Sequence, residues 1–109
     1  MANPGDVVTV DFPGATGIKR RPAVIVSTAT YHASRPDVIL GLLTSQSGKA
    51  SAPTDYLLQD WAAAGLHNPS AFRSFLATLP ASGIRVIGKL SARDWQEVQA
   101  RLRLALAVT

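Results

Sequence analysis

The chain has 109 residues, 47% apolar and 17% charged, and its 11 Lys and Arg against 7 Asp and Glu give a net charge of +4. This composition fits one folded domain over residues 1–109 and excludes a disordered chain. The lack of cysteine excludes disulfides, thiolate nucleophiles and Cys-ligated zinc. Two histidines and one glutamate leave little for a metal cage, so we expect no metal and no cofactor.

The sequence also bears on location. Its first residues, MANPGD, lack the basic stretch and apolar run of a signal peptide. Apolar stretches such as residues 38–43 fall far below the ~18 residues that a spanning helix needs. We therefore expect a cytoplasmic protein that does not contact a membrane.

The first half of the chain is predicted to be β-structure. Residues 6–12 largely alternate polar and apolar side chains, as in a half-buried strand, and turn residues follow at 13–17. Residues 22–27 and 38–44 are short and almost wholly apolar, which is typical of buried strands. Gly41 in the second of these indicates a bulge or a close backbone contact.

The connections between these strands are predicted from turn-forming residues and from charge. Residues 31–37 are predicted to be a loop, because they are polar and include Pro36. Residues 45–53 are small and polar, with Lys49 as their one charge, and residues 54–58 are predicted to form a hairpin with the preceding strand.

The middle of the chain is less regular. Residues 60–66 are predicted to form a short helix that ends at Gly65. Residues 70–79 fit a helix and a strand almost equally well by periodicity, and their aromatic and Thr content favours a strand. Residues 84–88 are predicted to be a further short strand.

The C-terminal segment has the pattern of an amphipathic helix. Ser91 is a suitable N-cap, and Asp94 three residues later makes a pair that resembles a capping box. One face carries apolar residues at a spacing of three to four: Trp95, Val98, Leu102, Ala105 and Leu106. Five or six short strands with one terminal helix predict a mainly β fold, a small β-barrel with the helix packed on it.

Basic residues are densest at Lys19, Arg20 and Arg21, which are predicted to lie on a loop rim at a strand entry. Such a cluster either binds a phosphate or simply keeps a turn solvated. Arg21 differs from the other two because Pro22 follows it and disfavours helical backbone, which holds Arg21 extended.

Hydroxyl and amide groups end the strand at 38–44. Thr44, Ser45, Gln46 and Ser47 can donate to phosphate oxygens, or they can bond nearby backbone groups as in an ordinary turn.

Other candidate residues carry less signal. His32 and His67 lie in separate segments and are predicted to be surface residues. Trp95 is expected in the core, whereas Trp61 could equally stack on a base. The sequence has no P-loop, GxGxxG, HExxH or GxSxG motif.

Several segments taken together resemble the MazF/PemK toxin family. The most specific are Gly5-Asp6-Val7-Val8-Thr9-Val10-Asp11-Phe12, Lys19-Arg20-Arg21-Pro22-Ala23-Val24-Ile25-Val26-Ser27 with Tyr31, and Leu42-Leu43-Thr44-Ser45-Gln46. The match continues through Asp60-Trp61, Gly65-Leu66 and Pro69-Ser70 to Ile87-Gly88-Lys89-Leu90-Ser91. It covers nearly the whole chain, from Pro4 to Val108.

The resemblance implies an SH3-like β-barrel with a packed C-terminal helix, usually in a homodimer. It also implies a metal-independent endoribonuclease that cuts single-stranded RNA at short sequences and is neutralised by a cognate antitoxin with an acidic segment. The family's catalytic arginine falls on Arg21 and its catalytic threonine on Thr44. The segment from Pro13 to Arg20 is shorter than in other members, which leaves the recognition sequence open.

These roles agree with elementary chemistry. Cleavage without a metal requires the ribose 2′-hydroxyl to attack the adjacent phosphate, and a guanidinium such as that of Arg21 can stabilise the charge that develops. The Thr44 hydroxyl would donate to the phosphate or to the leaving oxygen. Flanking phosphates or bases would be held by Lys19, Arg20, Ser45 and Gln46.

Two other functions are compatible with the same fold. The first is a toxin that binds and poisons a protein target such as gyrase. The second is a small barrel that binds RNA without cleaving it.

Overall fold

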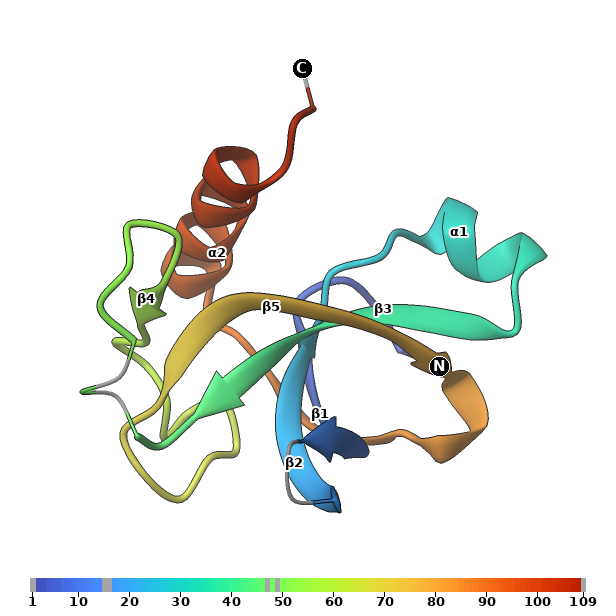
Figure 1. Ribbon diagram of the computed structural model, residues 1–109, viewed down its shortest axis with the longest axis horizontal. Helices are drawn as coiled ribbons and strands as arrows, with labels where there is room; N and C mark the ends of the chain where they lie inside the picture. Colours follow the sequence, from blue (N-terminus) through green and yellow to red (C-terminus); the bar gives the residue numbers. More distant parts are fainter. Residues whose placement is uncertain (1, 15–16, 47, 49, 109) are drawn as a thin grey trace.

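The computed structural model describes residues 2–14, 17–46, 48 and 50–108. Its framework is an antiparallel sheet with the strand order β4-β5-β3-β2-β1-β6 (Figure 1). The strands are β1 (Asp6–Gly14), β2 (Gly17–Ile25), β3 (Asp37–Thr44), β4 (Tyr56–Leu57), β5 (Ala71–Pro80) and β6 (Arg85–Lys89). The helices are α1 (Ala29–Ser34), the 3₁₀ turn η2 (Ala81–Gly83) and α2 (Ala92–Ala105).

Strands β1 and β2 form a long hairpin whose pairing runs from Val7 opposite Val24 to Gly14 opposite Gly17. The turn predicted at 13–17 is therefore wrong at both ends, because Pro13, Gly14 and Gly17 belong to the paired strands. The central residues Ala15 and Thr16 lie outside the described residues. Pro13 is tolerated in β1 because β6 pairs only with Asp6–Thr9 and leaves the later part of β1 with one partner. The basic residues 19–21 consequently lie within β2, not on a loop rim.

Strands β2 and β3 separate after a short pairing. They pair only through Ala23, Val24 and Ile25, and the β3–β5 register shifts between Gly41 and Leu43. This shift confirms the irregularity predicted at Gly41, where a Cβ would overlap the Phe72 ring. Beyond it β3 pairs with β5 alone in the described part of the chain. Residues 17–22 of β2 therefore have β1 on one side and, among the described residues, a free edge on the other.

Three expectations for the connections are wrong. Strand β4 pairs with β5 and not with β3, because β5 already occupies that edge of β3. Residues 29–34 form a helix where a loop was expected, begun by the Thr28 side chain, which accepts from the Tyr31 amide. Residues 61–65 form successive turns rather than a helix, and Gly65 adopts φ +91°.

Alternation along the strands divides the core between the two faces of the sheet. Val7, Val24 and Leu43 belong to a cluster on the face that also packs against Val98 of α2. Their neighbours Val8, Ala23 and Leu42 belong to a second cluster on the opposite face. We call these the helix face and the open face. Trp61 and Trp95 are both partly buried against the helix-face cluster, so Trp95 packs as expected and Trp61 packs in the same way.

Helix α2 confirms the predicted C-terminal helix and its Ser91 N-cap, but the Asp94 carboxylate is used differently from a capping box, since it accepts from Tyr56 and from the Gln59 and Asp60 amides. The Ser91 side chain accepts a hydrogen bond from the Asp94 amide. Val98 is buried, whereas Ala105 and Leu106 are exposed, so the packed face is shorter than the apolar pattern suggested. The predicted strand at 70–79 is confirmed as β5. No helix among the described residues is long and apolar enough to cross a membrane.

Candidate functional site

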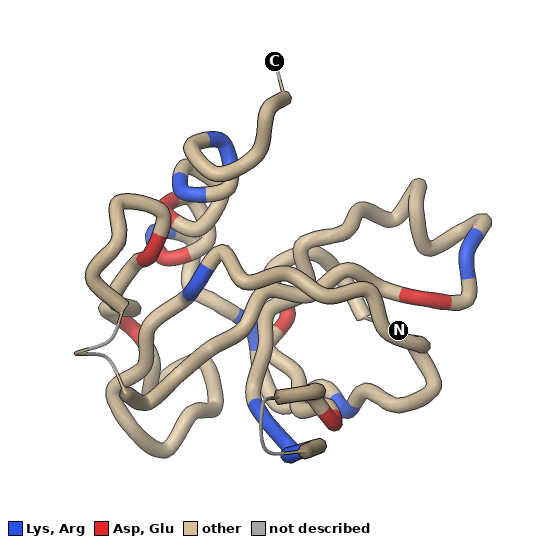
Figure 2. Tube along the Cα trace, in the orientation of Figure 1, with Lys and Arg blue, Asp and Glu red and all other residues tan. Residues whose placement is uncertain are grey.

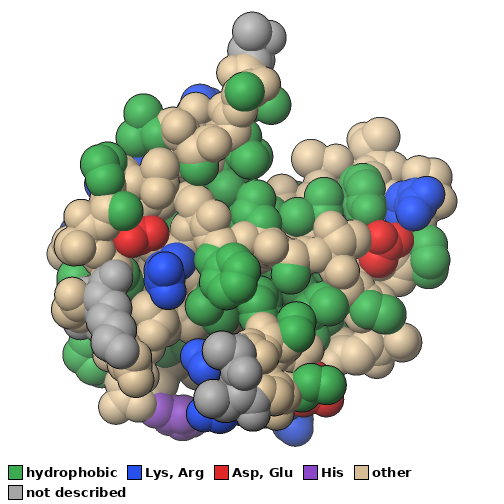
Figure 3. Space-filling view, viewed as in Figure 1, with side chains coloured by type: hydrophobic (Ala, Val, Ile, Leu, Met, Phe, Trp, Pro, Cys, Tyr) green, Lys and Arg blue, Asp and Glu red, His purple; other side chains and the backbone are tan. Residues whose placement is uncertain are grey.

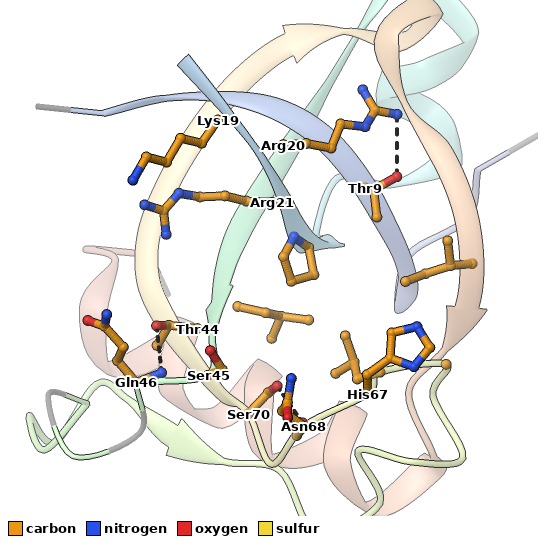
Figure 4. Close-up of a pocket in the computed structure, with 15 residues that line it drawn as sticks. Thr9, Lys19, Arg20, Arg21, Thr44, Ser45, Gln46, His67, Asn68 and Ser70 are labelled. Carbon is orange, nitrogen blue, oxygen red and sulfur yellow. Dashed lines mark hydrogen bonds between the residues drawn. The ribbon is translucent and has the colours of Figure 1, made fainter. Parts of the chain in front are cut away.

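A hollow of about 620 Å³ opens where β2 and β3 separate. Its walls come from the free edge of β2, the end of β3, the segment 65–70 and Ile87 of β6 (Figure 4). All six residues that the sequence singled out line it: Lys19, Arg20, Arg21, Thr44, Ser45 and Gln46. Two segments far apart in the sequence therefore meet at one site.

The three consecutive cations of β2 do not point the same way, because successive side chains of a strand face opposite sides of a sheet. Arg20 lies opposite Asp11 in the register and donates to Asp11 Oδ1 at 3.5 Å, to Thr9 Oγ1 at 3.3 Å and to the Gly83 carbonyl at 3.3 Å. Lys19 and Arg21 extend together to the side opposite Arg20, which is also the side on which Thr44 and Gln46 lie (Figure 4). Neither of these two forms an ion pair with any described residue.

Thr44 ends β3 and lines the hollow. The oxygen Oγ1 accepts a hydrogen bond from the Gln46 amide at 3.1 Å, which is the ordinary turn chemistry of a strand end. A hydroxyl that accepts one bond still has its own proton to donate. The turn contact therefore fixes the position of the oxygen and leaves the donor available to a ligand. Ser47, the last hydroxyl of this predicted group, lies outside the described residues.

The segment next to Thr44, just before β5, adds residues outside the six that the sequence placed at the site. His67, Asn68 and Ser70 line the hollow from the segment before β5. Ser70 is buried and donates to the Asn68 carbonyl at 2.8 Å, which braces the segment. The sequence indicated that this segment belongs to the site only through the Gly65-Leu66 and Pro69-Ser70 part of the family resemblance.

Glycine makes this part of the wall possible. A Cβ on Gly65 would lie 2.5 Å from the Ile87 carbonyl oxygen, and a Cβ on Gly88 would overlap the Ala64 carbonyl. The turn 61–65 and strand β6 are thus in backbone-to-backbone contact, an approach that a side chain would prevent. This contact positions His67 and Asn68 in the hollow.

His67 is exposed, as predicted, whereas His32 is partly buried, and the two line different hollows. His32 lies in α1, where its Nε2 is 2.6 Å from the buried Ser27 hydroxyl, and it lines a different hollow. No group of three His, Asp or Glu among the described residues could hold a metal ion.

Charge is unevenly arranged over the molecule (Figure 2). Two of the three cations of α2 lie beside acids, with Arg93 paired to Asp60 at 2.8 Å and Arg101 to Glu97 at 2.6 Å. The Arg93 and Ser91 side chains lower the pKa of Asp60 from 3.8 to about 2. Lys19 and Arg21, in contrast, leave the hollow with positive charge that can bind an anion.

Comparisons with known proteins identify the family. Residues 3–106 match the PemK-like, MazF-like toxins of type II toxin–antitoxin systems. A sequence comparison with curated proteins found no match.

Solved structures share the fold. A mycobacterial endoribonuclease solved with its cognate antitoxin superposes with a TM-score of 0.80 at 18% identity, over 100% of this chain and 98% of that one. MazF from a MazE–MazF complex of Deinococcus radiodurans gives 0.76 at 21% identity, over 98% and 97%. These likenesses confirm the mainly β fold with a C-terminal helix. The chain belongs to the family of PemK-like, MazF-like toxins of type II toxin–antitoxin systems.

Proposed function

We propose that this toxin is a metal-independent, sequence-specific endoribonuclease that cuts single-stranded RNA, with residues 1–109 acting as one toxin domain. The observation that carries the proposal is the meeting of Arg21 and Thr44 in one hollow, although they come from strands that have separated. Arg21 forms no ion pair with any described residue, so its guanidinium is available to a phosphate.

The reaction needs only groups that the hollow and the RNA provide. The ribose 2′-oxygen forms a bond to phosphorus while the bond from phosphorus to the 5′-oxygen breaks. The 2′-proton is lost to solvent and the leaving 5′-oxygen gains one. The products are a 2′,3′-cyclic phosphate and a 5′-hydroxyl.

The two proposed catalytic residues have different roles. Arg21 binds the non-bridging phosphate oxygens and stabilises the extra negative charge of the transition state, since a guanidinium stays protonated. Thr44 donates its hydroxyl proton as a hydrogen bond to the phosphate or to the leaving 5′-oxygen.

The neighbouring residues hold the strand in place. Lys19 provides positive charge for a flanking phosphate on the side of Arg21, and Arg20, whose guanidinium also binds Asp11, adds charge on the other side of β2. Ser45 and Gln46 provide neutral donors and acceptors for phosphates or bases. Bases must be splayed out to be read in such a hollow, so single strands are the substrate.

The proposal extends to partners. The similar mycobacterial structure contains a cognate antitoxin, and the free cations of β2 suit an antitoxin with an acidic segment. Family resemblance further supports a homodimer that acts in the cytoplasm.

Purified protein incubated with defined RNA in EDTA tests the proposal. We expect cleavage at a short sequence with 2′,3′-cyclic phosphate ends, and loss of cleavage in Arg21→Ala. The matched control Arg103→Ala, on the exposed last turn of α2, should cut normally.

Three results would contradict the proposal. A 3′-hydroxyl with a 5′-phosphate would indicate attack by water. RNA that is bound but left intact would indicate a non-catalytic barrel. Toxicity without cleavage, suppressed by mutations in a protein such as gyrase, would indicate a protein poison.

A further inference from the structure

The open face of the sheet carries more than the proposed catalytic pair. Ala23 and Leu42 belong to its core cluster, and alternation puts Arg21 and Thr44 on the same face. Thr44 lies opposite Ala71 in the register, so Arg73, two residues further along β5, also lies on this face. Arg73 thus lies on the same face as the proposed catalytic residues Arg21 and Thr44 but does not line the hollow.

Arg73 is a partly buried residue of β5. It forms no ion pair with any described residue. Its Nε is buried and has no hydrogen-bond partner among the described atoms. A buried donor without a partner is costly, so Nε itself gives the fold no stabilising hydrogen bond.

Phe75 follows on the same face of β5 and is 50% exposed. Its ring packs edge-on against Phe12, with centroids 5.7 Å apart and an interplanar angle of 67°. Phe12 lies opposite Lys19 in the β1–β2 register, so Lys19 is beside this aromatic pair. Phe12 is buried and holds the Phe75 ring in place, which leaves an exposed aromatic surface of fixed orientation.

Apolar and basic side chains meet on this side of the molecule, where hydrophobic groups over β5 have Lys or Arg beside them (Figure 3). Exposed aromatic rings flanked by cations are what single-stranded nucleic acids bind: bases stack on the ring and phosphates pair with the cations. The acid nearest to Lys19 in the β1–β2 register, Asp11, points to the other face and is bound by Arg20.

We propose that Arg73 and Phe75 form a second RNA-binding surface, continuous with the hollow, that holds the nucleotides flanking the cleaved bond. Arg73 pairs with a flanking phosphate and Phe75 stacks on a flanking base. This inference rests on the proposed endoribonuclease function and adds to it the path by which the RNA leaves the hollow.

Two synthetic RNAs with the same cleavage site test this surface, one with a single nucleotide on each side and one with about six. For each variant, the kcat/KM of the long RNA is divided by the kcat/KM of the short RNA. We expect Phe75→Leu to lower this ratio by about tenfold, because base stacking is lost. Phe75→Trp should keep the ratio. The fluorescence of the introduced tryptophan should be quenched when the variant binds the long RNA carrying 2′-O-methyl groups. Leu104→Ala, another exposed apolar residue, is the control and should leave the ratio unchanged.

The cation is tested by salt dependence. Removing one phosphate contact with Arg73→Gln should reduce the slope of log binding constant against log salt by about 0.7, the value for one phosphate on a single strand. Arg103→Gln, exposed at the end of α2, should leave the slope unchanged.

The outcomes separate the two proposals. If the wild type cuts neither RNA, the endoribonuclease proposal fails and this inference fails with it. If the wild type cuts both RNAs but folded Phe75→Leu and Arg73→Gln behave like it, only the second surface is refuted. If Phe75→Leu instead converts a dimer to a monomer in sedimentation, the face joins two copies of the chain and the inference is wrong.

Discussion

The Tyr56 hydroxyl donates a 2.6 Å hydrogen bond to the carboxylate of Asp94, a residue with no exposed surface. The same carboxylate accepts from the Gln59 and Asp60 amides at 3.1 and 2.8 Å. Burial and the neighbouring Asp94 raise the pKa of Tyr56, which keeps its proton in place as a donor. Asp94 thereby joins α2 to the segment that leads into the wall of the hollow.

Asp94→Ala should therefore destabilise the fold strongly. It leaves a hydroxyl and two amides without their acceptor, which we expect to lower the free energy of unfolding by ~2–4 kcal/mol. Tyr56→Phe removes one donor and should cost ~1 kcal/mol. Urea denaturation measures both, with Arg103→Ala as the surface control. An Asp94→Ala variant as stable as the control would show that the network contributes nothing.

Stability should also fall in acid because of Asp60. Hydrogen bonds from Arg93 and from Ser91, at 2.8 and 2.5 Å, lower its pKa from 3.8 to about 2. A carboxyl whose pKa is lower in the folded state stabilises the fold above its unfolded pKa and loses this contribution as pH falls through the folded value. The urea midpoint should thus drop between about pH 4 and 2. Arg93→Gln should lessen that drop, and an unchanged pH profile in this variant would refute the assignment.

Gly65 tests whether the backbone contact with β6 shapes the hollow. Gly65→Ala adds strain at φ +91° and brings a Cβ within 2.5 Å of the Ile87 oxygen, so it should cost ~1–3 kcal/mol. In the protein that remains folded, cleavage of RNA should fall because His67 and Asn68 are displaced. Gly83→Ala is the matched control, since a Cβ there has no neighbour within 4 Å. Equal cleavage by the two folded variants would mean that this wall does not matter.

Local signals predicted the elements well but not their partners. Alternation, turn residues and the Ser91 cap indicated most strands and the C-terminal helix, because these depend on nearby residues. The partner of residues 56–57 depends on which strand occupies the edge of β3, and no local pattern records this.

The candidate site was predictable only in part. Residue type and family resemblance indicated six of the residues that line the hollow, three in β2 and three at or just after the end of β3. Extending the strand through residues 19–21 would also have predicted that Arg20 faces away from Arg21, since strand alternation requires it. His67 was predicted only as a surface residue and Asn68 was not identified, because both reach the hollow only through the separation of β2 from β3 and the close contact at Gly65.

The Thr44 hydroxyl offers the sharpest test of the proposed chemistry, because three side chains of similar size can occupy its position. Thr44→Ser keeps the oxygen that accepts from the Gln46 amide and keeps a donor for the RNA, so cleavage should stay within about tenfold of the wild type. Thr44→Val keeps the shape but removes both functions. It should lower kcat by ~10²–10³, the usual loss for one donor to a developing negative charge, with a smaller change in KM. Single-turnover cleavage in EDTA measures both variants. If Thr44→Val cuts as fast as Thr44→Ser, the hydroxyl takes no part in the reaction and Arg21 alone carries the transition state.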